Sequence, residues 1–143
     1  MTRLKIAKLC FYIVAIGLFG TGLIYMFLGT PMPYHLDAMQ VAWSDLPQQY
    51  QVIITAFQRG AASGFLGGGI AIAMMTFFAL ERGGSWVRWG ILLMGLIETI
   101  PAIHSVSQVM KHTPGEPPLG ALVIFTILTL AGFFLSKSKN EPA

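Results

Sequence analysis

Four long stretches that are almost free of charge occupy most of this chain of 143 residues. The stretches without Asp, Glu, Lys or Arg are residues 9–34, 60–80 and 117–136. A fourth stretch, 89–110, contains only one such residue, Glu98. The hydrocarbon core of a bilayer is about 30 Å thick, and about 20 helical residues cross it. Each stretch is therefore long enough to form a transmembrane helix.

The connections between these stretches are short, so consecutive helices are expected to run antiparallel. We predict an all-α membrane protein with four transmembrane helices in an up-down-up-down bundle, forming one domain over residues 1–143. The predicted spans are residues 6–29, 52–80, 86–110 and 118–136. The composition agrees, because only 10% of the residues are charged, against about 25% in soluble domains.

The distribution of positive charge predicts the orientation of this bundle. The basic residues that fall on one side are Arg3, Lys5, Lys8, Arg82, Arg88, Lys137 and Lys139. The opposite connections contain only Lys111 and the marginal Arg59. Because basic residues are retained on the cytoplasmic side of a membrane, we predict that both termini are cytoplasmic. These basic residues at the ends of the predicted helices also explain the pI near 9.3. Because they lie where lipid headgroups would be, we expect membrane lipids, and not nucleic acid, as partners.

Glycines recur along one face of the segment 52–80. Gly60, Gly64 and Gly68 follow a four-residue spacing, and Gly67 lies on the same side. In lipid, helices associate through close packing of small residues, because there is little hydrophobic force between them. We predict that this face packs against another helix. That helix belongs either to the same bundle or to a partner in a homo-oligomer or a larger membrane complex.

Polar residues interrupt the segment 86–110. Glu98 falls near its middle, where ionisable groups are costly and often functional, and His104 and Gln108 share a face nearer the outer side. One interpretation is a cavity, open to the outer side and also lined by Arg59, that binds an amphipathic ligand. The other is that Glu98 is protonated and hydrogen-bonded to a neighbouring helix. His104 and Gln108 are then interfacial, and Arg59 reaches lipid headgroups.

The longest connection, over residues 31–46, carries aromatic and polar side chains to the same outer side. It contains Tyr34, His35 and Trp43. The candidate ligand-binding residues are therefore Glu98, His104, Arg59, His35, Tyr34, Trp43 and Gln108. A lipid headgroup or a quinone is the type of ligand that such a pocket suits.

Signatures of common enzymes are missing from the sequence, which has no GxSxG, HExxH or P-loop pattern. His35, His104 and His112 fall on the outer side with methionines nearby, a donor set that suits copper. However, these histidines are scattered, and Cys10 is the only cysteine. We therefore predict no catalytic residue, no metal site and no cofactor, and keep a membrane enzyme or a copper-handling factor as the least favoured alternative.

Several motifs resemble those of a group of uncharacterised bacterial membrane proteins of similar length, often labelled as domains of unknown function. The motifs are MPYHLDAM, QRGAASGFLGGGIA, RGGSWVRWG and HTPGEPPLG, and the resemblance covers most of Pro31 to Gly120. It implies four spans, a bacterial inner-membrane location and a common outer-face feature that includes Tyr34, His35 and Arg59. It implies no activity.

Two functional hypotheses follow from the sequence. The first is a small inner-membrane protein that acts through helix packing, as an accessory or structural subunit or as a homo-oligomer. The alternative is a lipid-binding or quinone-binding protein with a pocket in the outer half, between the segments 52–80 and 86–110.

Overall fold

The computed structural model describes residues 2–82 and 84–137. It contains five α-helices, and none of the residues that it describes forms a β-strand. The helices are α1 (Arg3–Phe27), α2 (Pro33–Met39), α3 (Gln48–Met74), α4 (Ser85–His112) and α5 (Leu119–Leu135). A short 3-10 turn, η1 (Trp43–Asp45), precedes α3, and a π-helical turn, η2 (Met75–Ala79), continues it. The prediction of an all-α fold is confirmed.

Three helical segments are long and apolar enough to cross a membrane. They are Arg3–Phe27, Gln48–Ala79 and Ser85–His112, whereas α5 is also apolar but has only 17 residues. The side chains that face outward from these helices are largely apolar; Ile16, for example, is 72% exposed and Phe27 is 80% exposed. An exposed apolar surface that extends over the helices indicates a membrane protein.

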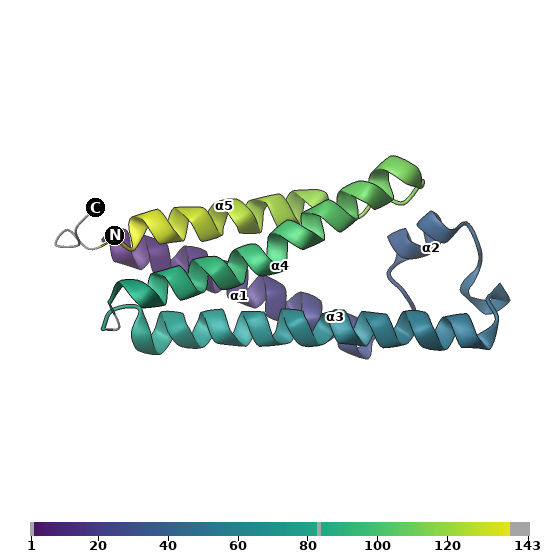
Figure 1. The fold of residues 1–143 in the computed structure, drawn as a ribbon, viewed down its shortest axis with the longest axis horizontal. Helices are drawn as coiled ribbons and strands as arrows, with labels where there is room; N and C mark the ends of the chain where they lie inside the picture. The colour runs from purple at the N-terminus through teal and green to yellow at the C-terminus, as the bar shows by residue number, and fades with distance from the viewer. Residues whose placement is uncertain (1, 83, 138–143) are drawn as a thin grey trace.

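The four long helices form two layers, with α1 and α3 in one and α4 and α5 in the other (Figure 1). The layers converge at the end that contains the N-terminus and the α3–α4 connection, which we call the closed end. They separate at the opposite end, the open end, where α2 and the α4–α5 connection lie (Figure 1). The contact between α1 and α3 is the most extensive, and that between the consecutive helices α3 and α4 is much smaller than the contacts that α5 makes with α1 and with α4.

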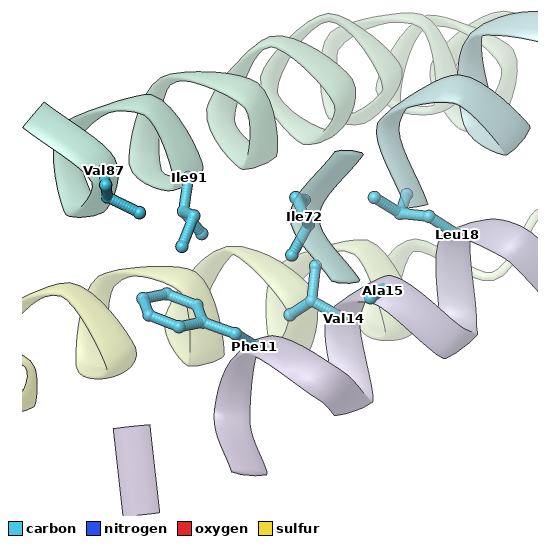
Figure 2. Packing of buried hydrophobic residues seen from close by; sticks show 7 residues of the cluster. All are labelled: Phe11, Val14, Ala15, Leu18, Ile72, Val87 and Ile91. Atoms are coloured by element: carbon cyan, nitrogen blue, oxygen red, sulfur yellow. The ribbon is translucent and has the colours of Figure 1, made fainter. Parts of the chain in front are cut away.

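Aliphatic and aromatic side chains fill the closed end completely. The buried cluster consists of Phe11, Val14, Ala15, Leu18, Ile72, Val87 and Ile91 (Figure 2). Each of these side chains is at most 2% exposed. Since helices in lipid are held mainly by close packing, this cluster is the principal source of contact between the two layers.

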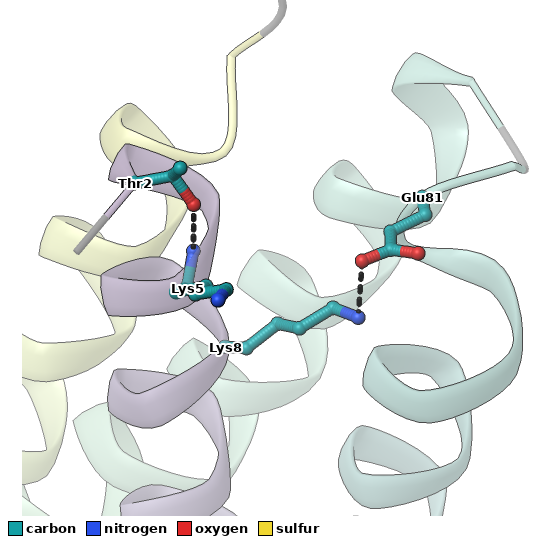
Figure 3. A network of polar contacts seen from close by, with 4 residues as sticks. All are labelled: Thr2, Lys5, Lys8 and Glu81. Carbon is teal, nitrogen blue, oxygen red and sulfur yellow. Dashed lines mark hydrogen bonds and ion pairs between the residues drawn. The ribbon is translucent and has the colours of Figure 1, made fainter.

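Polar contacts also tie the ends of helices together at the closed end. The Lys8 Nζ atom lies 2.7 Å from Glu81 Oε1, which joins the start of α1 to the residues that follow η2 (Figure 3). The Thr2 hydroxyl accepts a hydrogen bond from the backbone N–H of Lys5 and caps α1. The guanidinium of Arg88, which is buried, lies 4.9 Å from the centre of the Phe133 ring.

Small residues allow α1 and α3 to approach closely. A Cβ atom added to Gly69 would lie 2.8 Å from the backbone oxygen of Ala15. One added to Gly22 would lie 2.7 Å from Leu66 Cγ. Gly22 and Gly69 therefore set the short distance between these two helices.

The layers separate because α4 turns away from α3 towards the open end (Figure 1). Pro101 lies inside α4, where a proline removes one backbone hydrogen bond and clashes with the preceding turn. A helix bends at such a position. The bend opens space between the outer parts of α3 and α4.

Candidate ligand cavity at the open end

A cavity of about 380 Å³ lies between the two layers at the open end. Its wall includes Thr21, Ile24 and Tyr25 of α1, Ala61 and Phe65 of α3, Ala102, Ser105, Val106 and Val109 of α4, and Ala121, Leu122 and Phe125 of α5. Most of these side chains are apolar. The volume falls within the range of about 300 to 1,000 Å³ that is typical of small-molecule sites.

The floor of the cavity is an aromatic ring from α5. The ring of Phe125 packs on Gly17 of α1, where an added Cβ atom would clash with it. The lining residues of α4 run from Ala102 to Val109, so the cavity extends about 10 Å along that helix.

The roof of the cavity is α2 together with the α4–α5 connection. Gly115 of that connection is buried against α2, and an added Cβ atom would lie 2.5 Å from the backbone oxygen of Tyr34 and 2.9 Å from Ala38 Cβ. Only glycine permits this approach without displacing α2. Pro117 of the connection is also buried and lines the cavity.

Four rings form an aromatic cluster at the roof end of the cavity: Tyr25, Tyr34, His35 and Phe65. The hydroxyl groups of Tyr25 and Tyr34 are hydrogen-bonded to each other. The rings of Tyr34 and His35 have centroids 4.2 Å apart, and Tyr25 makes edge contacts with His35 at 6.2 Å and with Phe65 at 5.9 Å. Such edge-to-face pairs are favourable for aromatic rings. They hold the two hydroxyl groups and the imidazole at one place.

Tyr34 and His35, two members of the aromatic cluster, are uncharged at neutral pH. Burial raises the pKa of the Tyr34 phenol, and the hydrogen bond with Tyr25 raises it further. Burial lowers the pKa of His35 from its usual value. In the parts of the chain that the structure describes, the cavity is lined by no Asp, Glu, Lys or Arg. The site is therefore an apolar space with a neutral, hydrogen-bonding end.

Gln58, which the sequence analysis did not single out, holds Tyr25 in position. Its side chain is buried, and its amide nitrogen donates to the backbone oxygen of Tyr25 at 3.1 Å and lies 3.4 Å from that of Leu28. These bonds satisfy carbonyl groups at the end of α1 that have no partner within the helix. Gln58 lies on the same face of α3 as Ala62 and Gly69, and only the structure shows that this face packs on α1.

The predicted site residues are divided among several places. Tyr34 and His35 line the cavity together. Trp43 and Arg59 line a separate hollow of about 370 Å³ beside the start of α3. In that hollow, the Gln51 amide donates to the backbone oxygen of Trp43 at 2.9 Å.

Glu98 lies where α3 and α4 approach each other. A Cβ atom added to Gly68 would lie 2.8 Å from Glu98 Oε1, and one added to Gly64 would lie 3.9 Å from it. Within residues 2–82 and 84–137, the carboxyl group has no hydrogen-bond or ion-pair partner. Glu98 is four residues before Ala102, so it lies on the cavity-facing side of α4, one turn nearer the closed end.

His104 and Gln108 do not join any of these groups. Both are exposed on α4 and line neither the cavity nor the hollow. The cavity-facing side of α4 carries Ala102, Val106 and Val109, and the helical period of 3.6 residues places His104 and Gln108 on the opposite side.

The four glycines predicted to pack also differ in their surroundings. Gly64 and Gly68 face Glu98, whereas a Cβ atom added to Gly60 or Gly67 would have no atom within 4 Å. The face of α3 that carries Gly60 and Gly67 is thus open to the surroundings of the bundle.

No family model, no curated protein and no solved structure matches the chain. The resemblance to four-span bacterial proteins therefore stays a prediction. Among the described residues, no group of three or more His, Cys, Asp or Glu side chains is placed to hold a metal ion. Together, the fold and the cavity define an all-helical protein with three long apolar helices and a neutral, ligand-sized site.

Proposed function

We propose that the chain is a four-span protein of the bacterial inner membrane that binds an amphipathic lipid or quinone between its helical layers. The observation that carries the proposal is the apolar cavity that ends at the aromatic cluster of Tyr25, Tyr34, His35 and Phe65. An apolar space with a few converging polar groups at one end matches a ligand with an apolar body and one polar head.

The orientation in this proposal places the closed end in the cytoplasm. Support comes from the basic residues Arg3, Lys5 and Lys8 near the start of α1. Trp86 and Trp89 at the start of α4 are 65% and 55% exposed, as expected for indole rings at a membrane interface. The fourth crossing is α5, whose 17 residues extend over about 26 Å.

The length of α3 supports a position of the cavity near the outer boundary of the bilayer. The continuous helix Gln48–Ala79 has 32 residues, about 48 Å, which exceeds the hydrocarbon core by about 18 Å. If the excess projects on the outer side, the outer boundary lies near Arg59, next to Gln58. Because Gln58 donates to the backbone oxygen of Tyr25, the aromatic cluster lies at the same boundary. The ligand head would then sit at the interface, with its apolar body in the membrane.

The proposal can be tested by purifying the protein in a mild detergent and measuring co-purified lipids and quinones by native mass spectrometry. Val106→Phe fills the cavity wall, and Val123→Phe makes the same change on a side chain of α5 that does not line the cavity and is 40% exposed. We expect Val106→Phe to lower ligand retention by about tenfold, which corresponds to about 1.4 kcal/mol. Val123→Phe should retain the wild-type amount. Equal retention by both variants, or no ligand on the wild-type protein, would count against the proposal.

One observation favours a second function, that of a subunit or homo-oligomer. The open face of α3 carries Gly60 and Gly67, and small residues on a lipid-facing surface allow another helix to approach closely. Gly60→Leu and Gly67→Leu would block such an approach without disturbing contacts inside the bundle. A homo-oligomer or a larger complex should have a native mass greater than that of one chain, and the two variants should lower that mass. A wild-type protein that is monomeric and without partners contradicts it.

A further inference from the structure

The aromatic cluster at the roof of the cavity offers O–H and N–H donors to a ligand. In the Tyr25–Tyr34 pair, one hydroxyl donates to the other, so the proton of the accepting hydroxyl remains available. The neutral imidazole of His35 carries one N–H group. The hydroxyl protons of Thr21 and Ser105, which also line the cavity, are not available to a ligand, because these groups donate to the Gly17 and Pro101 backbone oxygens at 2.9 and 3.0 Å. The roof therefore suits a ligand oxygen that accepts hydrogen bonds.

The lining residues that the structure describes carry no charged side chain, which restricts the chemistry of the ligand's head group. A phosphate, carboxylate or ammonium group in this cavity would lose water without gaining an opposite charge, which is costly. Arg59, the nearest basic residue of α3, lines the other hollow and not this cavity. The head is therefore an uncharged carbonyl or hydroxyl group.

The size and opening of the cavity restrict the rest of the ligand. A space of about 380 Å³ that extends about 10 Å along α4 accommodates a compact body and not the two chains of a phospholipid. Ala61 of α3 and Ser105 of α4 line the cavity and are also exposed. They face the gap between α3 and α4, whose contact is the smallest between consecutive long helices. A tail can leave the cavity there and enter the membrane.

We infer that the cavity takes a single-tailed, uncharged amphipath whose head oxygen accepts a hydrogen bond from the Tyr25–Tyr34 pair and whose tail leaves between α3 and α4. Quinones and long-chain lipid alcohols have this chemistry. The inference rests on the proposed ligand-binding function and adds the charge of the head and the direction of the tail.

The charge of the head is tested on the full chain in detergent with four probes. They are a single-tailed quinone, a long-chain alcohol, and a carboxylate and a trimethylammonium amphiphile of the same chain length as the alcohol. We expect the quinone and the alcohol to bind at least about tenfold more tightly than the two charged probes. Equal or tighter binding of a charged probe would overturn the inference while leaving the proposed function in place. If no probe binds, both are overturned.

A variant locates the head at the roof. Tyr34→Phe removes one hydroxyl of the pair, and Tyr50→Phe makes the same change on an exposed tyrosine that does not line the cavity. Loss of one neutral hydrogen bond should weaken alcohol binding by roughly two- to tenfold. Tyr50→Phe should leave it unchanged. Unchanged binding by a folded Tyr34→Phe protein would overturn the placement of the head.

A second pair of variants tests the exit of the tail. Ser105→Trp narrows the gap between α3 and α4, whereas His104→Trp adds the same bulk on the side of α4 that faces away from the cavity. We expect Ser105→Trp to weaken binding of a long-tailed quinone several-fold more than that of a short-tailed one. His104→Trp should affect neither. Equal weakening of the two quinones by Ser105→Trp would overturn this exit.

Discussion

The closed and open ends of the bundle are built from the same helices but differ in how the helices meet. At the closed end, side chains such as Phe11, Ile72 and Ile91 fill the space between the layers and are fully buried. At the open end, the bend at Pro101 and the ring of Phe125 on Gly17 separate the layers and leave a cavity. The comparison indicates that the closed end holds the helices together, whereas the ligand that we propose would occupy space at the open end that no side chain fills.

The largest effect should come from removing a side chain at the closed end. Phe11→Ala leaves a hole in the buried cluster and should lower the free energy of unfolding by about 3 to 5 kcal/mol. Thermal unfolding in detergent measures this loss. Phe57→Ala removes the same side chain where it is 76% exposed, and it should have little effect. Similar losses from both variants would show that the closed end does not dominate stability.

A smaller effect is expected where α1 and α3 are closest. Gly69→Ala places a methyl group against the backbone oxygen of Ala15 and should lower the free energy of unfolding by about 1 to 3 kcal/mol. The same unfolding assay applies. Gly67→Ala lies two residues earlier in open space, so it should be neutral or slightly stabilising, since alanine favours helix more than glycine does. A larger loss of stability from Gly67→Ala than from Gly69→Ala would contradict the close packing of α1 and α3 at Gly69.

The open end should become less stable in mild acid because of His35. Burial lowers its pKa, so below about pH 6.5, the usual value for histidine, the unfolded chain binds the proton before the folded chain does. Stability is therefore unaffected above that pH and falls as the pH drops towards the lower, folded-state pKa. His35→Gln should make the melting temperature less sensitive to pH between about 7 and 5. The exposed His104→Gln should melt like the wild type, and a His35→Gln protein with unchanged pH dependence would contradict a buried imidazole.

The smallest effect should come from the ion pair between Lys8 and Glu81 at the closed end. The Glu81 side chain is 55% exposed and that of Lys8 is 23% exposed, and ion pairs that solvent reaches contribute little. Glu81→Gln should change the melting temperature less than Gly69→Ala does, and the difference from the wild type should vanish in high salt. A large loss of stability in Glu81→Gln would mean that polar contacts, and not packing, hold the closed end.

The candidate site could be predicted only in part. Tyr34 and His35 were identifiable because aromatic and polar side chains in a short outer connection stand out in an apolar chain, and both line the cavity. Tyr25 and Gln58 were missed because nothing in the sequence marks which face of α1 or α3 turns inward. His104 and Gln108 share a face of α4, but that face points away from the cavity.

The sequence by itself determined the class of protein and the positions of its long helices, because the thickness of a bilayer sets how long each apolar stretch must be. That constraint acts on each stretch separately. The rotation of each helix, the closeness of α1 to α3 at Gly22 and Gly69 and the position of α2 above the cavity were decided only in the tertiary structure. Lipid and neighbouring helices are almost equally apolar, so hydropathy does not distinguish the face that packs from the face that is exposed.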